Sequence, residues 1–189
     1  MHYSGVTLIE LLLTLCVAGL LLALALPGFN RLTATHQGSA AINQMIGAVH
    51  YVRNAAVTHR TTVTLCPSAS GVNCTRRNEW HLGAIAFADA NHNGRMDPSD
   101  YLLRGFPALP PGHRIYWRSF RNKKYLQINS RGLTNWQNGN LLYCPPDDDV
   151  RLARLLIINA QGRVRQAPDV NSDGVVENAR GRAVACPGR

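Results

Sequence analysis

The feature that most constrains this chain of 189 residues is a long apolar segment near its N-terminus. Residues 6–26 contain one charged side chain, that of Glu10. A helix needs about 20 apolar residues to cross the hydrocarbon of a bilayer, so this segment is long enough to span a membrane. A cleavable secretory signal has a basic start and a shorter apolar core, whereas residues 1–5 contain no Lys or Arg. The pattern therefore predicts a hydrophobic membrane-spanning helix over residues 6–29.

Glu10 needs a partner, because a carboxylate within a membrane-spanning helix costs about 2.5–3.5 kcal/mol. Residues 5–10 read GVTLIE, which resembles the leader of type IV pilins and type II secretion pseudopilins. The resemblance implies cleavage by prepilin peptidase between Gly5 and Val6, methylation of the new N-terminus, and contact between Glu10 and the terminal amine of a neighbouring pilin during assembly. It also implies a single-pass inner-membrane protein with its domain in the periplasm, later assembled into a pilus at the cell surface. The alternative is an ordinary signal anchor.

The apolar spacing continues after Pro27 with the period of a helix. The residues that share one helical face are Ile42, Met45, Ile46, Val49, Val52 and Ala56. This predicts a helix that continues to about Thr58. Beyond residue 60, short β-branched and aromatic runs separated by Gly, Pro and Asn predict strands. We expect these near residues 62–66, 80–88, 113–118, 125–128, 141–144, 155–159, 162–166 and 183–186.

No linker or internal repeat divides the chain beyond the apolar segment. Residues 30–189 are therefore predicted to form one soluble domain, with an Arg-rich C-terminal tail at residues 160–189. The expected fold class is α+β: the pilin fold, with a long N-terminal helix packed on a mainly antiparallel β-sheet.

The cysteines indicate an oxidising compartment. Cys16 lies in the apolar segment, which leaves four cysteines on the far side of the membrane. Four cysteines allow three pairings. We favour Cys66–Cys74, which closes a short loop, and Cys144–Cys186, which ties the tail to the sheet. No CxxC or CxxH spacing is present, so the cysteines do not predict a zinc site or a thiol enzyme.

A second signature lies in the domain itself. Residues 80–103, YLQINSRG at residues 125–132 and LLIINAQGRVR at residues 155–165 resemble the GspH and FimT family of minor pilins. The GRVR element at residues 162–165, near a disulfide-tied C-terminus, is more similar to FimT than to the secretion pseudopilin. FimT is a minor pilin implicated in DNA binding during natural transformation, so the resemblance implies DNA as a partner.

The charge of the chain agrees with a polyanionic partner. The formal net charge is +9, and residues 104–131 contain seven cations and no acid. Alternation along a strand would place Arg163 and Arg165 on one side, and likewise Arg180 and Arg182, and the small Gly162 would let a polyanion approach. Such contacts read phosphate and not base sequence. The candidate DNA-binding residues are Arg163, Arg165, Gly162, Arg180, Arg182, Arg154, Arg121, Lys123 and Lys124. The alternative is a solvated strand face whose arginines pair with acids such as those at residues 147–149.

Two loops have spacings that suit calcium. Asp89, Asn91, Asn93, Gly94, Asp97 and Asp100 occupy positions 1, 3, 5, 6, 9 and 12 of an EF-hand-like loop. The alternative is a turn closed by Asx hydrogen bonds. A weaker copy contains Asp169, Asn171, Asp173, Gly174 and Glu177, but it has Arg180 where an acid should close the loop. No other cofactor is predicted.

The sequence contains no GxSxG or HExxH motif and therefore does not predict an enzyme. The expected function is that of a minor type IV pilin that binds DNA without sequence preference for uptake in natural transformation. The alternative is a GspH-like minor pseudopilin of type II secretion, or a minor pilin that acts only in filament assembly or priming.

Overall fold

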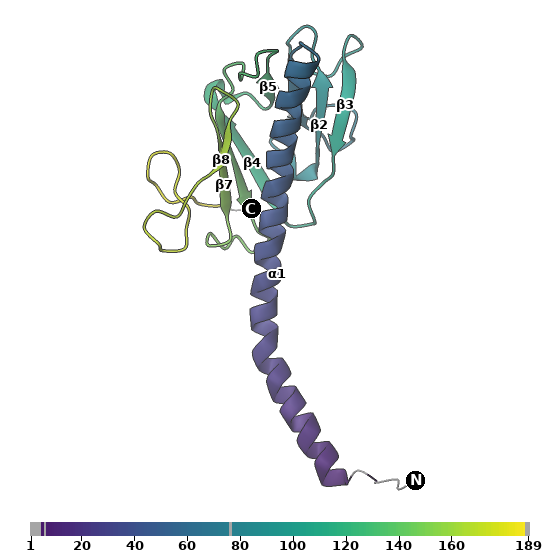
Figure 1. The fold of residues 1–189 in the computed structure, drawn as a ribbon, viewed down its shortest axis with the longest axis vertical. Coiled ribbons are helices and arrows are strands. Elements are labelled where there is room, and N and C mark those ends of the chain that lie inside the picture. The colour runs from purple at the N-terminus through teal and green to yellow at the C-terminus, as the bar shows by residue number, and fades with distance from the viewer. Residues whose placement is uncertain (1–4, 6, 76, 188–189) are drawn as a thin grey trace. The chain divides into compact units, whose positions relative to one another are not determined.

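The computed structural model describes residues 5, 7–75 and 77–187, apart from the side chains at positions 27 and 30 (Figure 1). The chain divides into two compact units, residues 1–37 and 38–189, which are described separately. One helix, α1 (Leu8–Thr58), contributes residues to both units. It is helical through position 27 and ends at Thr58.

The first unit consists of the N-terminal part of α1. From Leu8 to Leu26, the Leu, Ile and Val side chains are 52–79% exposed. The helix is long and apolar enough to cross a membrane, with a mean hydropathy of 2.6 over its most apolar window. Because water disfavours so much apolar surface, this segment requires lipid or another apolar surface around it.

The second unit has a core between the C-terminal part of α1 and two sheets. The buried stripe of the helix contains Ala41, Ile42, Met45, Ala48, Val49, Val52, Ala55 and Ala56. In Figure 1, strands β2 and β3 lie on one side of this part of the helix and β4, β7 and β8 lie on the other. Side chains from both sheets join the stripe in one hydrophobic cluster. No described residue before Gly38 is buried, so this core belongs to the second unit.

The two sheets each have four strands, and all strand pairs are antiparallel. The first has the order β3-β2-β1-β5 and consists of β1 (Val63–Pro67), β2 (Ala84–Ala88), β3 (Tyr101–Phe106) and β5 (Leu126–Ile128). The second has the order β4-β6-β7-β8 and consists of β4 (Arg114–Ser119), β6 (Gly139–Cys144), β7 (Arg154–Ile158) and β8 (Val164–Gln166). The predicted α+β class is confirmed.

Three local predictions differ from the structure. Residues 80–82 form a short 3-10 helix, η1 (Trp80–Leu82), before β2. Strand β3 was not predicted, because its mostly exposed edge position leaves little apolar alternation to detect. Residues 183–186 have no neighbouring strand and make only the isolated bridge Glu177–Ala183. The predicted tail thus includes β8, and residues 167–187 after it form a series of turns; from here on, the C-terminal tail means these residues.

Side chains of the second sheet alternate between an inner face and an outer face. The inner face supplies the core residues Ile115, Trp117, Leu141, Tyr143, Leu156 and Ile158. On the outer face, one row across the four strands joins Arg118, Asn140, Ile157 and Arg165. The register of the sheet thus aligns arginines from its two edge strands.

Candidate functional site

Arg163 immediately precedes β8 and Arg165 lies within it, both on the outer side of the second sheet. Val164 between them is partly buried and packs against the core, so the two arginines flank a side chain that points inward. Both arginines are exposed, and neither forms an ion pair with any residue that the structure describes. Their guanidinium donors are therefore available to an anionic ligand.

Arg118 extends this surface across the sheet. It is exposed and lies in the same cross-strand row as Arg165, three strand spacings away, which corresponds to about 14 Å between backbones. Asn140 and Ile157 between them are only partly buried. We name Arg118, Asn140, Ile157, Arg163 and Arg165 the basic face. Sequence reasoning missed Arg118, because its membership depends on the pairing of β4 with β6.

Gly162 has a structural role that differs from the sequence-based expectation. It is buried in the turn between β7 and β8 with a φ of 67°. A Cβ at this position would lie 2.8 Å from the Gly132 carbonyl oxygen and 3.4 Å from Cδ of Arg53. The space beside Gly162 is thus filled by protein, and its missing side chain serves the turn instead of the approach of a polyanion.

Within the described residues the same turn occurs three times, at residues 129–133, 159–163 and 178–182. In each, an Asn begins the turn, the Gly at the fourth position has a positive φ, and the Gly N–H donates to the Asn carbonyl. The Asn Oδ1 also accepts from the backbone N–H of the fifth residue. This is the type I turn with a glycine bulge that connects the strands of hairpins with three-residue loops.

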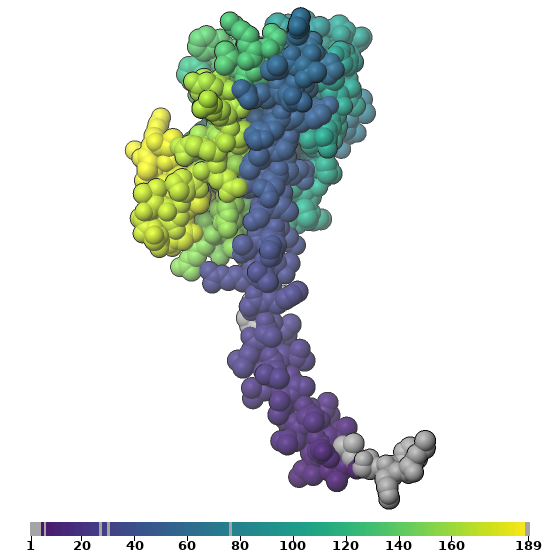
Figure 2. Space-filling view, in the orientation of Figure 1, coloured from purple at the N-terminus to yellow at the C-terminus, as the bar shows by residue number. Residues whose placement is uncertain are grey.

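The third copy changes the interpretation of Arg180 and Arg182. Gly181, with a φ of 71°, separates them within a turn, so strand alternation does not give them a common side. The base of their hairpin is attached after β8, where the Glu177 N–H donates to the Pro168 carbonyl. Figure 2 shows the tail in yellow as a protrusion beside the green sheet. Arg163, by contrast, precedes β8.

Arg154 belongs to a different surface from Arg165. It pairs with Tyr143 at the start of β7 and lies on the same face of this strand as the core residues Leu156 and Ile158. Its Nη1 donates to the carbonyl oxygens of Arg151, at 3.1 Å, and Ala153, at 2.9 Å. Its guanidinium therefore helps to hold the loop before β7, and the structure does not place it on the basic face.

Arg121, Lys123 and Lys124 form a separate lobe after β4. Arg121 is the middle residue of η2 (Phe120–Asn122) and has a positive φ. Its guanidinium lies over two rings, 5.8 Å from Phe120 and 5.7 Å from Trp136. The Lys123 ammonium lies 5.8 Å from the Tyr125 ring.

The aromatic part of this lobe is exposed. Phe120 is 54% and Trp136 is 66% exposed, whereas Trp117 on the same strand segment is buried. Exposed aromatic rings beside cations are suited to stacking against nucleic-acid bases. Sequence reasoning did not single out Trp136, whose backbone adopts a positive φ in the loop before β6.

The loop after β2 is closed by its own hydrogen bonds. Asp89 is fully buried, and its carboxylate accepts from Thr64 Oγ1 at 2.6 Å, Gln127 Nε2 at 2.7 Å, Gly94 N at 2.9 Å and Asn93 N at 3.1 Å. These four donors use the acceptor capacity that a cation would need from the first ligand of the loop.

The other acids of this loop have internal partners as well. The Asp97 carboxylate accepts from the hydroxyl of Ser99 and from the side-chain amides of Asn91 and Asn93, and these bonds hold its pKa below the ordinary value. The Asp100 carboxylate accepts from two backbone N–H groups. This arrangement is the Asx-closed turn that the sequence left as the alternative to calcium.

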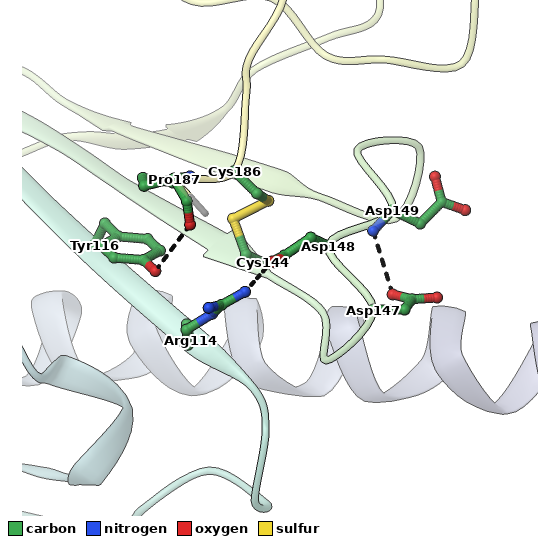
Figure 3. Close-up of polar contacts among 8 residues, drawn as sticks. All are labelled: Arg114, Tyr116, Cys144, Asp147, Asp148, Asp149, Cys186 and Pro187. Atoms are coloured by element: carbon green, nitrogen blue, oxygen red, sulfur yellow. Dashed lines mark hydrogen bonds and ion pairs between the residues drawn. A yellow bond between two sulfur atoms is a disulfide. The ribbon is translucent and has the colours of Figure 1, made fainter. Parts of the chain in front are cut away.

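Two contacts attach the end of the tail to the second sheet (Figure 3). Cys186 is bonded to Cys144 at the end of β6, and the Tyr116 hydroxyl donates to the Pro187 carbonyl at 3.4 Å. Arg114 nearby is paired with Asp148, which raises the arginine pKa. The other disulfide joins Cys66 to Cys74. Both bridges are the pairings that the sequence favours.

Of the N-terminal candidates, Glu10 lies on the exposed part of α1. Gly5 is exposed, whereas Val6 is outside the described residues. The Glu10 N–H lies 3.4 Å from Thr7 Oγ1, and the Glu10 carboxylate has no hydrogen bond or ion pair with any described side chain. An exposed carboxylate on an apolar helix is therefore available to a partner outside the chain.

Residues 41–162 match the model of a protein family described as "Type II transport protein GspH". The match spans the helix stripe, the first sheet, strands β4, β6 and β7 of the second sheet, and Gly162, whereas β8 lies beyond it. No curated protein matches the sequence.

Two kinds of solved structure have a similar fold. The type IV minor pilin FimU of Pseudomonas aeruginosa has a TM-score of 0.55 at 15% identity, covering 69% of this chain and 87% of that chain. The minor pseudopilin EpsH from the Type 2 Secretion System of Vibrio cholerae has a TM-score of 0.50 at 8% identity, covering 71% and 99%. At these identities the likeness establishes the fold alone, which is the pilin fold.

Proposed function

Because this chain belongs to the GspH family of minor pilins and pseudopilins, we propose that it acts as a minor subunit in the assembly of a type IV pilus or type II secretion pseudopilus. The family consists of structural subunits, and the chain is not an enzyme. The observation that carries the proposal is the N-terminal part of α1, whose apolar side chains are 52–79% exposed. Such a surface suits the inner membrane before assembly and the helices of other pilins afterwards.

In this proposal, prepilin peptidase removes residues 1–5, which frees the amine of Val6. Glu10 then pairs with the terminal amine of a neighbouring subunit, which compensates its charge in an apolar surrounding. The domain faces the periplasm while the helix is in the membrane, and it reaches the cell surface when the filament is a pilus.

Substitution of Glu10 tests this role. Glu10→Gln keeps the size of the side chain and removes its charge, and Thr14→Ala, one helical turn away, is the control. We expect Glu10→Gln to remain in the membrane fraction but to be lost from sheared filaments, and Thr14→Ala to be incorporated normally. Incorporation of Glu10→Gln at the wild-type level would exclude the charge-pairing step. Retention of residues 1–5 in Gly5→Ala, measured by intact-protein mass spectrometry, tests the processing step.

A second candidate function is capture of DNA, as in FimT. One observation favours it: Arg163 and Arg165 are exposed, share the outer side of the sheet with Arg118, and have no acidic partner among the residues described. Guanidinium groups bind phosphate through paired donors, and such contacts do not depend on base sequence. In this view the lobe at Arg121, Lys123 and Lys124, and the hairpin at Arg180 and Arg182, are accessory contacts.

Salt dependence of DNA binding tests this second candidate. Each phosphate contact contributes about 0.9 to the slope of log affinity against log salt, so Arg163→Gln with Arg165→Gln should lower the slope by about 1.8. The control is Arg77→Gln with Arg95→Gln, which removes the same charge from loops of the first sheet. An equal reduction of the salt slope in both double variants would indicate that DNA binding depends on the net charge of the protein and not on a site at Arg163 and Arg165.

The two functions have different consequences in cells. Loss of DNA uptake with normal filaments in the Arg163 and Arg165 variant would support DNA capture. Loss of filaments or of secretion on deletion of the chain, with DNA uptake unaffected by the arginine variant, would leave assembly as the sole role.

A further inference from the structure

We propose that the C-terminal tail binds a calcium ion through the carboxylates of Asp169, Asp173 and Glu177. One carboxylate oxygen from each of these residues lies within 4.8 Å of the other two. They belong to the loop between β8 and the hairpin at residues 178–182. The inference goes beyond the filament role and does not depend on it.

The strongest evidence is the environment of Glu177. This side chain is only 6% exposed, and its Oε2 accepts from the Val170 N–H at 2.8 Å. Its Oε1 is buried and has no hydrogen-bond partner among the described residues. A buried carboxylate oxygen without a donor is costly, and a cation between Glu177 and the two aspartates would satisfy it.

The two aspartates are held in place by the backbone of the loop. Asp169 accepts from the N–H groups of Ser172, at 2.7 Å, and Gly174, at 2.8 Å. Asp173 accepts from the Val175 N–H at 2.8 Å and from Asn171 Nδ2 at 3.0 Å. Because each carboxylate has about four lone-pair sites, these bonds orient the side chains and leave acceptor capacity for an ion.

The charge of the cluster is not compensated from within the protein. None of the three carboxylates forms an ion pair with a residue in the described part of the chain. Three negative charges within hydrogen-bonding reach of a shared point repel one another, although the whole chain carries a net charge of +9. A divalent cation would remove this repulsion.

The donor set indicates which cation. All three side chains offer carboxylate oxygens, and the cluster contains no His or Cys, so the set suits a hard cation and not zinc. Calcium accepts six to eight oxygen ligands with flexible geometry, and the exposure of Asp169 and Asp173 leaves room for water to complete them. Because only three carboxylates contribute and two of them are exposed, we expect a dissociation constant of about 0.1–1 mM, typical of extracellular modules.

Sequence spacing alone ranks the loop at Asp89 above the tail loop as a calcium site, and the structure favours the opposite ranking. The loop at Asp89 matches the EF-hand spacing more closely, but the Asp89 carboxylate already has four internal donors. The tail loop has the poorer spacing and contains the unpartnered oxygen. The tertiary environment, and not the spacing, separates the two.

The test is a calcium titration of the full chain, oxidised and solubilised in detergent, by isothermal calorimetry and by thermal unfolding in EGTA or calcium. Wild-type protein should bind one calcium ion per chain, and about 10 mM calcium should raise its Tm by roughly 3–10 °C. Magnesium at the same concentration should have a smaller effect.

Two variants locate the site. Glu177→Gln keeps the side-chain oxygen for Val170 and removes the charge, and it should weaken calcium binding by at least tenfold. Asp97→Asn alters the Asp89 loop and should leave binding unchanged. Should Glu177→Gln fail to fold, Asp173→Asn provides the same test, because Asp173 is exposed and its substitution should also weaken calcium binding. Absence of binding at about 10 mM calcium, full affinity in the Glu177 or Asp173 variant, or loss of affinity in Asp97→Asn would each overturn the proposal.

Discussion

Removal of the Cys144–Cys186 bridge should destabilise the domain more than removal of Cys66–Cys74. The first bridge closes a loop with a sequence separation of 42, and the second one of 8. From the loop-closure entropy of the unfolded chain, these lengths correspond to about 4 and about 2.5 kcal/mol. Each bridge joins a buried strand cysteine to a partly exposed loop cysteine, so the two double Ala variants are well matched.

The measurement is urea unfolding of a fragment of residues 30–189, which includes the whole described core and lacks Cys16. With an m-value of about 2 kcal/mol per molar urea, the midpoint should fall by about 2 M without Cys144–Cys186 and by about 1.2 M without Cys66–Cys74. Equal losses, or a larger loss from the shorter loop, would refute the reasoning. They would show that contacts of the tail, such as that of Tyr116 with Pro187, and not chain entropy, determine the effect.

Three other predictions concern local features. Gly162→Ala should cost at least about 2 kcal/mol of unfolding free energy, because its Cβ would lie 2.8 Å from the Gly132 oxygen, whereas Gly181→Ala, with a similar φ and open space, should cost about 1 kcal/mol. Burial lowers the pKa of His113, so the unfolded chain takes up the proton first, and stability should fall as the pH drops below about 6.5. Urea midpoints at pH 5 and pH 7.5 measure this, and His113→Asn should reduce the difference between them. Asp89→Ala removes the acceptor of four hydrogen bonds and should cost more than about 3 kcal/mol, equally in calcium and in EGTA.

The sequence alone determined the features that depend on local periodicity. The apolar run, interrupted only by Glu10 among charged residues, and the later helical stripe predict α1 to its end at Thr58, because both patterns can be recognised within a few residues. Most strands follow from short β-branched runs, and the favoured cysteine pairs are those that the structure contains. The family also follows from short motifs within the chain.

Only the tertiary structure decided which of these residues share a surface and which already have hydrogen-bond partners within the protein. Arg118 joins Arg165 through strand pairing between segments far apart in the chain. Strand pairing likewise places Arg154 on the inner side of the second sheet, and the backbone of Gly132 fills the space beside Gly162. Asp89 is saturated by Thr64 and Gln127, each more than twenty residues away, whereas Glu177 retains a buried oxygen without a donor. Spacing along the chain cannot report such contacts, because burial and hydrogen-bond satisfaction depend on neighbours that only the folded chain brings together.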